Sequence, residues 1–73
     1  MQKLITITFC NEHGDDIMGD AVVDFACFEE DNKMVEEVTA IALPENAPKY
    51  FRERMTLRDR ITTAFHKGEG YNL

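Results

Sequence analysis

Serine is absent from this 73-residue chain, so enzymes with a serine nucleophile are excluded. Other catalytic signatures are missing as well: the chain has no Cys-x-x-Cys, no His-Glu-x-x-His and no glycine-rich loop followed by lysine. A chain this short also leaves little room for a concave substrate pocket of several hundred cubic ångströms or more, roughly the usual size. The sequence therefore predicts a protein that is not an enzyme and that binds no cofactor.

Long hydrophobic runs are also missing. The longest are Phe25–Phe28 and Ala40–Leu43, whereas a membrane-spanning helix needs about 20 apolar residues. The beginning of the chain lacks the long apolar region and small-residue cleavage site of a secretory signal. A composition of 44% apolar and 30% charged residues is typical of a globular chain. We therefore expect one soluble, cytoplasmic domain spanning residues 1–73.

Soft metal ligands are scarce, and they are limited to Cys10, His13, Cys27 and His66. A zinc site would need all four to converge, although only the first two are close in sequence. The acids after Cys10 do not have the spacing of a calcium-binding EF-hand loop. Antiparallel pairing of the first two expected strands would place Cys10 opposite about Asp20 and Cys27 opposite about Lys3. We therefore expect no metal and no disulfide, with both thiols acting as small buried hydrophobic groups.

Basic residues are almost absent from the first two thirds of the chain. Residues 11–46 hold eleven of the fourteen acids and one base, while residues 47–67 hold six of the eight bases and two acids. The formal charges are −10 and +4. This partition predicts an acidic β-rich part (1–43), a basic helical part (44–68) and a loose tail (69–73). Each charged part is a candidate contact surface.

The acidic part is predicted to form three antiparallel strands, at about residues 2–10, 20–29 and 33–43. The first is rich in β-branched residues and alternates in polarity. The other two runs also fit helical stripes. Strands are favoured because Val, Phe and Cys dominate 20–29 and because the polar segment 30–33 is typical of a hairpin turn. The glycines and acids of 11–19 predict a loop.

The basic part is predicted to be helical, in two pieces at about 46–55 and 57–67, packed on one face of the sheet. A single continuous helix would place Arg54 and Arg58 in the middle of its apolar half. A break before Leu57 removes this conflict, with Thr56 as N-cap and Asp59 at the third helical position. Gly68 is typical of a helix end. The expected fold class is thus α+β, with a three-stranded sheet and a C-terminal helical segment.

The acidic surface leads to the first functional hypothesis, a small non-enzymatic protein that docks on a partner protein. The candidate contact residues are Asp15, Asp16, Glu29, Glu30, Asp31, Glu36 and Glu37. Chains of this size and charge layout are similar to accessory proteins of bacteriophages and mobile elements, which modulate or inhibit a host or defence machine. This likeness rests on size and layout without a matching motif. DNA mimicry is a variant of the hypothesis that requires acids spaced like phosphates.

The basic segment leads to a different class of function. Arginines beside aromatic side chains bind phosphates and stack on bases, so a nucleic-acid-binding or regulatory protein is the first alternative. Its candidate residues are Tyr50, Arg52, Arg54, Arg58 and Arg60. The competing interpretations are a solvated helix face and arginines that fold back on the acidic sheet of the same chain or of a dimer mate. The second alternative is a structural homo-oligomer, such as a homodimer, whose strand edge is covered by its own copy.

Overall fold

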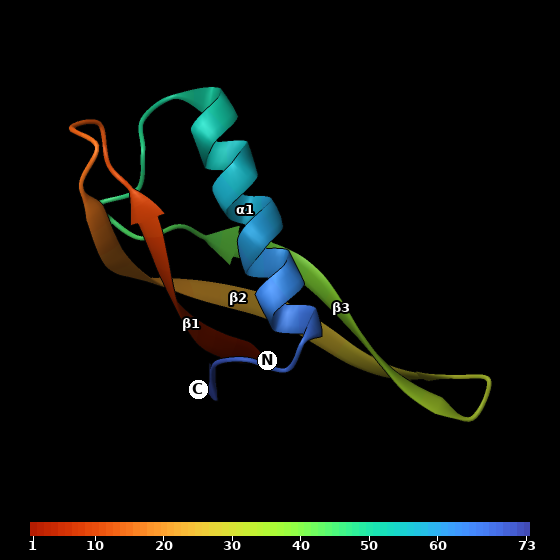
Figure 1. Ribbon diagram of the computed structural model, residues 1–73. Coiled ribbons are helices and arrows are strands. Elements are labelled where there is room, and N and C mark those ends of the chain that lie inside the picture. Colours follow the sequence, from red (N-terminus) through yellow and green to blue (C-terminus); the bar gives the residue numbers. More distant parts are fainter.

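A four-stranded antiparallel sheet carries one helix on one face in the computed structural model, which describes residues 1–73 (Figure 1). The elements are β1 (Gln2–Cys10), β2 (Asp16–Glu30), β3 (Lys33–Ala42), α1 (Phe51–His66) and β4 (Tyr71–Asn72). The strand order across the sheet is β3-β2-β1-β4. The expected α+β class with a C-terminal helix is confirmed, but the sheet has four strands rather than three. No helix has the length and hydrophobicity needed to cross a lipid bilayer.

The loop between β1 and β2 is much shorter than expected. The side-chain oxygen of Asn11 accepts hydrogen bonds from the backbone amides of His13 and Asp15, both at 2.9 Å, and this closes the chain within five residues. β2 therefore starts at Asp16, and the predicted loop over 11–19 is wrong. The register shifts accordingly, so that Cys10 lies opposite Asp16.

This register also changes the surroundings of the two cysteines. Cys27 lies beyond the end of β1 and pairs with Glu36 of β3, not with Lys3. Both thiols are free, as expected, but both are exposed, so the prediction that they are buried is wrong. Cys27 is exposed because the length of β2 carries it past the region that the helix covers, and Cys10 is exposed because it lies on the face of β1 turned away from the core.

The ambiguous segments after residue 20 are both strands. β2 and β3 are joined by the two residues Asp31 and Asn32, whose φ angles of +50° and +64° match the type I′ turn of a tight hairpin. The predicted turn over 30–33 is confirmed. A β-bulge interrupts the ladder between the Asp24 and Phe25 pairs, and the Thr39 hydroxyl at this point donates to the Asp24 carbonyl at 3.2 Å.

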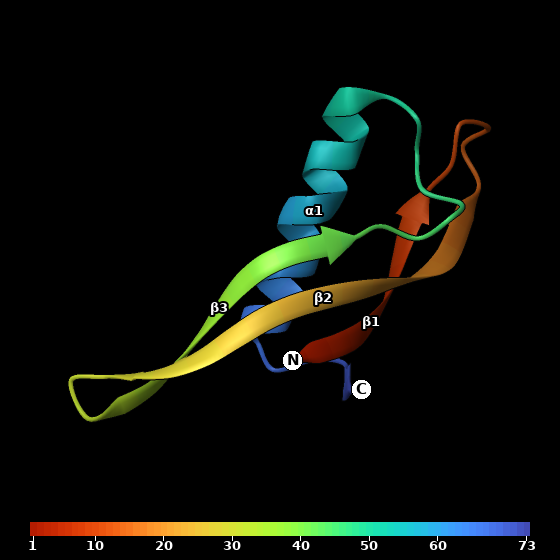
Figure 2. The same cartoon turned by 180° about the vertical axis from the view of Figure 1, so that it is seen from behind.

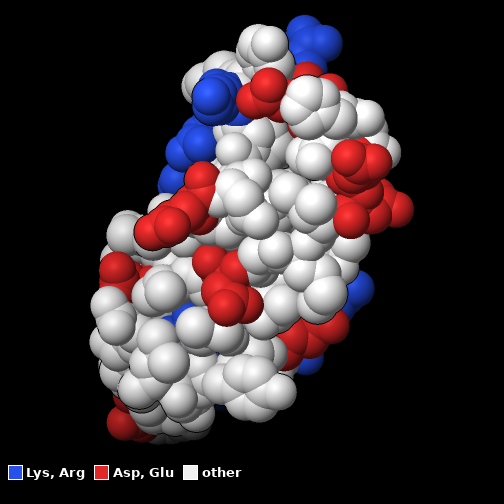
Figure 3. All heavy atoms as spheres, turned by 90° about the vertical axis from the view of Figure 1, so that its left-hand side faces the viewer, with Lys and Arg blue, Asp and Glu red and all other residues white.

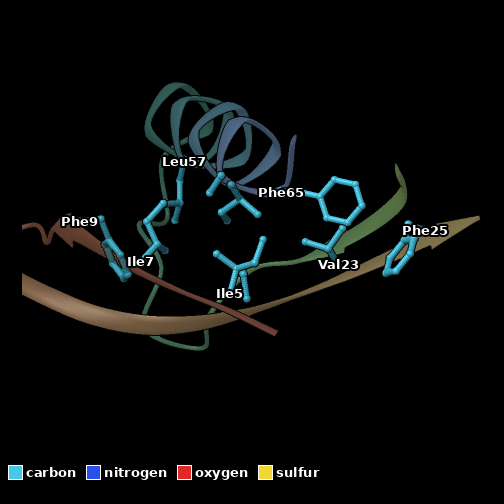
Figure 4. Close-up of a cluster of buried hydrophobic side chains, with 10 residues drawn as sticks. Ile5, Ile7, Phe9, Val23, Phe25, Leu57 and Phe65 are labelled. Atoms are coloured by element: carbon cyan, nitrogen blue, oxygen red, sulfur yellow. The ribbon is translucent and has the colours of Figure 1, made fainter. Parts of the chain in front are cut away.

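The core lies between the sheet and α1. Odd-numbered positions of β1 and β2 point to one face, while positions spaced by three, four or seven residues on α1 point back at them (Figure 4). The buried hydrophobic side chains are Ile5, Ile7, Phe9, Ala21, Val23, Phe25, Leu57, Ile61, Ala64 and Phe65. This single layer of apolar contacts holds the helix across the sheet.

The helix begins at Phe51 and is continuous to His66, so the predicted start at about residue 46 and the predicted break at residues 55–56 are both wrong. Thr56 is not an N-cap: its hydroxyl donates to the carbonyl of Arg52 at 3.1 Å, one turn earlier within the helix. The helix ends where expected. Gly68 has a φ of +83°, and its amide donates to the Phe65 carbonyl at 3.0 Å.

The C-terminal tail, which was predicted to be loose, forms β4. Tyr71 lies opposite Leu4, and the amide of Leu73 donates to the Gln2 carbonyl at 2.9 Å. Glycine at position 70 allows the tail to lie this close to β1, because a Cβ atom there would be 2.5 Å from the Leu4 carbonyl oxygen. The φ of Gly70 is +95°, which also favours glycine. A strand of two residues has no periodicity that a sequence could reveal.

Candidate interaction site

The hairpin formed by β2 and β3 extends well past the core. Phe25 is the last buried residue of β2, and Val38 opposite it is half-buried. Beyond this pair the hairpin projects past α1 and is not covered by it, as two opposite views show (Figures 1 and 2). The molecule is accordingly elongated, with extents of 48 × 22 × 17 Å. Residues 26–37 are called the arm below.

The arm is strongly acidic on both of its faces. It holds five of the fourteen acids and one base, which gives a formal charge of −4. Strand pairing places Glu30 and Glu37 on the face turned away from α1, and it places Glu29 and Glu36 on the same side as α1. Asp31 lies in the turn at the tip. No other layer of the protein covers either face, so all five carboxylates are open to a partner.

Apolar side chains lie among these acids. Phe28 is 39% exposed and Met34 is 68% exposed, while Val35 opposite Phe28 is half-buried. A two-stranded hairpin without a third element packed on it is only marginally stable in water. Exposed apolar groups on such an arm are therefore candidates for burial against another protein. Phe28 and Met34 were not among the predicted contact residues, although apolar residues on both faces of a predicted hairpin indicate such a contact.

The seven acids predicted as one contact surface divide into two sites. Glu29, Glu30, Asp31, Glu36 and Glu37 all belong to the arm. Asp15 and Asp16 lie in or beside the β1–β2 loop at the far end of β2. Fourteen steps along β2, from Asp16 to Glu30, correspond to about 46 Å at about 3.3 Å per residue. One small binding surface on a partner cannot contact both ends, and the arm is the larger cluster.

The sheet face turned away from α1 carries a row of acids along β2. Asp16, Asp20 and Asp24 share this face at intervals of four residues, or about 13 Å. Asp20 accepts a hydrogen bond from the Thr6 hydroxyl at 2.6 Å. Phosphates of one DNA strand recur about every 3.4 Å along the axis, so the row is roughly four times sparser. Figure 3 likewise shows acidic side chains in separate clusters with uncharged surface between them. This spacing disfavours DNA mimicry.

Three of the four helix arginines bind carbonyl oxygens of their own chain. Arg54 donates to Pro48 at 3.0 Å and Arg58 to Ile41 at 3.5 Å. Arg60 donates to Thr8 at 2.8 Å. These long side chains reach over the seam between α1 and the rest of the fold, and this explains how arginines are tolerated beside the apolar stripe of a continuous helix. Arg58 and Arg60 thus fold back on the sheet, as one interpretation expected of Arg58, but they bind backbone oxygens of β3 and β1 rather than carboxylates. Arg54, for which the same was expected, binds the segment before α1 instead.

The remaining candidate of the basic segment lies at the start of α1. Arg52 is exposed and is flanked by Tyr50 and Phe51, which are 65% and 80% exposed.

The side chains predicted as candidate soft metal ligands are dispersed over the molecule. Cys10 and His13 lie near the β1–β2 loop, Cys27 lies on the arm, and His66 lies in the last turn of α1. The structure contains no group of three or more His, Cys, Asp and Glu side chains arranged to hold a metal ion.

Comparisons with protein-family models, with curated proteins and with solved structures found no match to this chain.

Proposed function

We propose that this chain is a non-enzymatic interaction protein of the cytoplasm that docks its acidic arm on a partner protein. The observation that carries the proposal is the projection of residues 26–37 beyond the core, with both faces uncovered. The two exposed free thiols, Cys10 and Cys27, fit a reducing compartment.

The composition of the arm defines the surface that it would recognise. Five carboxylates favour a partner with a basic surface. Attraction between the opposite charges raises the rate of association, and repulsion between like charges disfavours acidic competitors. Phe28 and Met34 would supply affinity by entering an apolar depression, because a few buried apolar anchors carry most of the energy of an interface. By analogy with phage accessory proteins, the partner would be a nuclease, a polymerase or a defence complex that the docked arm modulates or inhibits.

Affinity capture from a lysate of the native host tests this proposal. The arm variant E29Q/E30Q/E36Q/E37Q removes four charges with little change in side-chain size, and it should lose the proteins that the wild type retains. The control variant E12Q/D15N/D16N/D20N removes the same number of charges at and beside the β1–β2 loop and should retain them. If the arm variant captures the same proteins as the wild type, the arm is not the contact surface.

The nucleic-acid alternative is supported by one feature, the exposed Tyr50 and Phe51 beside Arg52. Three internal hydrogen bonds of the other arginines count against it. Retention on DNA and RNA columns at low and moderate salt distinguishes the two functions. Binding that disappears in R52E/R60E would replace the docking proposal, whereas an absence of retention even at low salt removes the alternative.

A further inference from the structure

One edge of β1 is left without a neighbouring strand over most of its length. Met1 and Phe25 exchange both of their backbone hydrogen bonds, at 3.1 and 2.9 Å, so odd-numbered residues of β1 point their amides and carbonyls toward β2. Even-numbered residues point to the opposite side. There β4 pairs only with Lys3 and Leu4. The backbone groups of Thr6 and Thr8 therefore face a side of the sheet that has no strand.

A groove of about 600 Å³ runs between this edge and α1, although so short a chain was expected to leave little room for a hollow of this size. Its charged side chains are two acids, Asp59 and Glu69, and two bases, Arg60 and Lys67. The formal charges that line the groove therefore sum to zero, although the whole chain has a formal net charge of −6. Because two copies of an acidic chain repel each other wherever acidic surfaces meet, this neutral groove is a place where a second copy can approach without that penalty.

The two open edges of the sheet, β3 and the part of β1 beyond its pairing with β4, differ in how well they resist pairing with another strand. β3 carries Lys33, Glu36 and Glu37 and has a bulge, and such charges and bulges protect an edge from unwanted strands. The stretch of β1 from Leu4 to Cys10 has no charge, no proline and no glycine, and four of its residues are β-branched. This is the composition of a segment that pairs readily. On the groove side of β1, Arg60 covers only the Thr8 carbonyl.

We propose that the exposed edge of β1 binds the same edge of a second copy, antiparallel and about a two-fold axis at Thr8, which lies clear of the part of β1 that β4 covers. The two sheets would then join into one sheet of eight strands. Identical uncharged strands are self-complementary in such an isologous contact, and they bring Thr8 opposite Thr8 on the open face. A carbonyl oxygen has two lone pairs, so Thr8 can accept an amide of the second copy while it keeps its bond from Arg60.

The topology fixes how such a dimer displays its arms. Each arm begins next to residue 25, which pairs with the N-terminal end of β1. Since the two β1 strands run in opposite directions, the arms project from opposite ends of the joined sheet. The dimer is therefore bivalent, with two docking arms directed away from each other.

Sedimentation equilibrium of the full chain over a wide range of concentration tests the proposal, with two matched variants. Thr8→Lys places a lysine on the open face beside the axis and disturbs no bond to β2, whereas Ala40→Lys makes the same charge change on β3. The wild type and Ala40→Lys should dimerise. Thr8→Lys should raise the dimer dissociation constant at least about tenfold, because like charges then meet across the axis. This weakening should occur although the lysine lowers the net negative charge.

Amide hydrogen exchange gives an independent readout. Protection of the Thr6 and Thr8 amides should increase with protein concentration in the wild type and should stay low in Thr8→Lys, with circular dichroism showing that both are folded. A wild type that is monomeric at every concentration overturns the proposal. It is equally overturned if Ala40→Lys weakens the dimer as much as Thr8→Lys, or if protection of these two amides does not depend on concentration.

Discussion

The rings of Phe25 and Phe65 pack with their centroids 5.0 Å apart and their planes at 57°, at the point where α1 stops covering the sheet. Tilted contacts of this kind contribute about 0.5–1.5 kcal/mol beyond the area that they bury. The ammonium of Lys3 lies 5.6 Å from the centroid of the same Phe65 ring. This aromatic contact therefore joins the helix to β2 at the base of the arm, and it separates the packed part of the hairpin from the uncovered part.

Phe65→Leu should lower the free energy of unfolding by about 1–2 kcal/mol, because it removes the ring contact and leaves part of the site unfilled. Phe51→Leu makes the same chemical change at a position that is 80% exposed, and it should change stability by less than about 0.5 kcal/mol. Urea denaturation followed by circular dichroism measures both. Equal losses would mean that Phe65 contributes nothing through its packing.

Gly70→Ala should release β4 from β1. Its Cβ atom would meet the Leu4 carbonyl, and a φ of +95° is strained for alanine, so we expect a loss of about 1–3 kcal/mol. Gly14→Ala is the control, since its φ is +82° but nothing lies within 4 Å of the added atom. Release of β4 would be seen as fast hydrogen exchange of the Leu73 amide in Gly70→Ala but not in Gly14→Ala. Unchanged protection of that amide would show that Gly70 is not needed for the approach.

The features that the sequence predicts correctly are those specified by a few adjacent residues. Alternation identifies β1, the polar pair Asp31-Asn32 identifies the hairpin turn, and Gly68 identifies the end of the helix. β4 depends instead on a contact between Tyr71 and Leu4, which are remote in sequence. The start of β2 depends on the Asn11 side chain closing a tight loop, where acids and glycine suggested a long one.

The candidate site was predictable in composition but not in shape. The acids of the arm stand out in the sequence, yet their separation from Asp15 and Asp16 follows from the full length of β2. The predicted break in α1 failed for a related reason. A helical register assigns each residue to a face by its Cα position, whereas an arginine such as Arg54 reaches several ångströms to a carbonyl beyond that face.

The turn at the tip of the arm offers a local test. Asn32 has a φ of +64°, so Asn32→Ala should destabilise the arm by about 1–2 kcal/mol, whereas Asn32→Gly should stabilise it slightly. Because the arm lies outside the core, the effect should be confined to hydrogen exchange of its own amides. The exchange rate of the backbone amide of Val23, which lies in the core, provides the internal reference. Parallel changes at Val23 would indicate that the arm unfolds only together with the core.

Arg52 and Arg54 provide a matched pair that separates contact from charge. Arg54→Ala removes a partly buried hydrogen bond to Pro48, and it should lower the free energy of unfolding by about 1–2 kcal/mol because the bond is charge-assisted and the stem packs on the fold. Arg52→Ala removes the same charge from an exposed position and should cost less than about 0.5 kcal/mol. Urea denaturation at low and high salt measures both. Since salt screens net charge but leaves the Pro48 contact in place, the difference between the variants should persist at high salt; a difference that vanishes there would mean that the helix arginines act through charge alone.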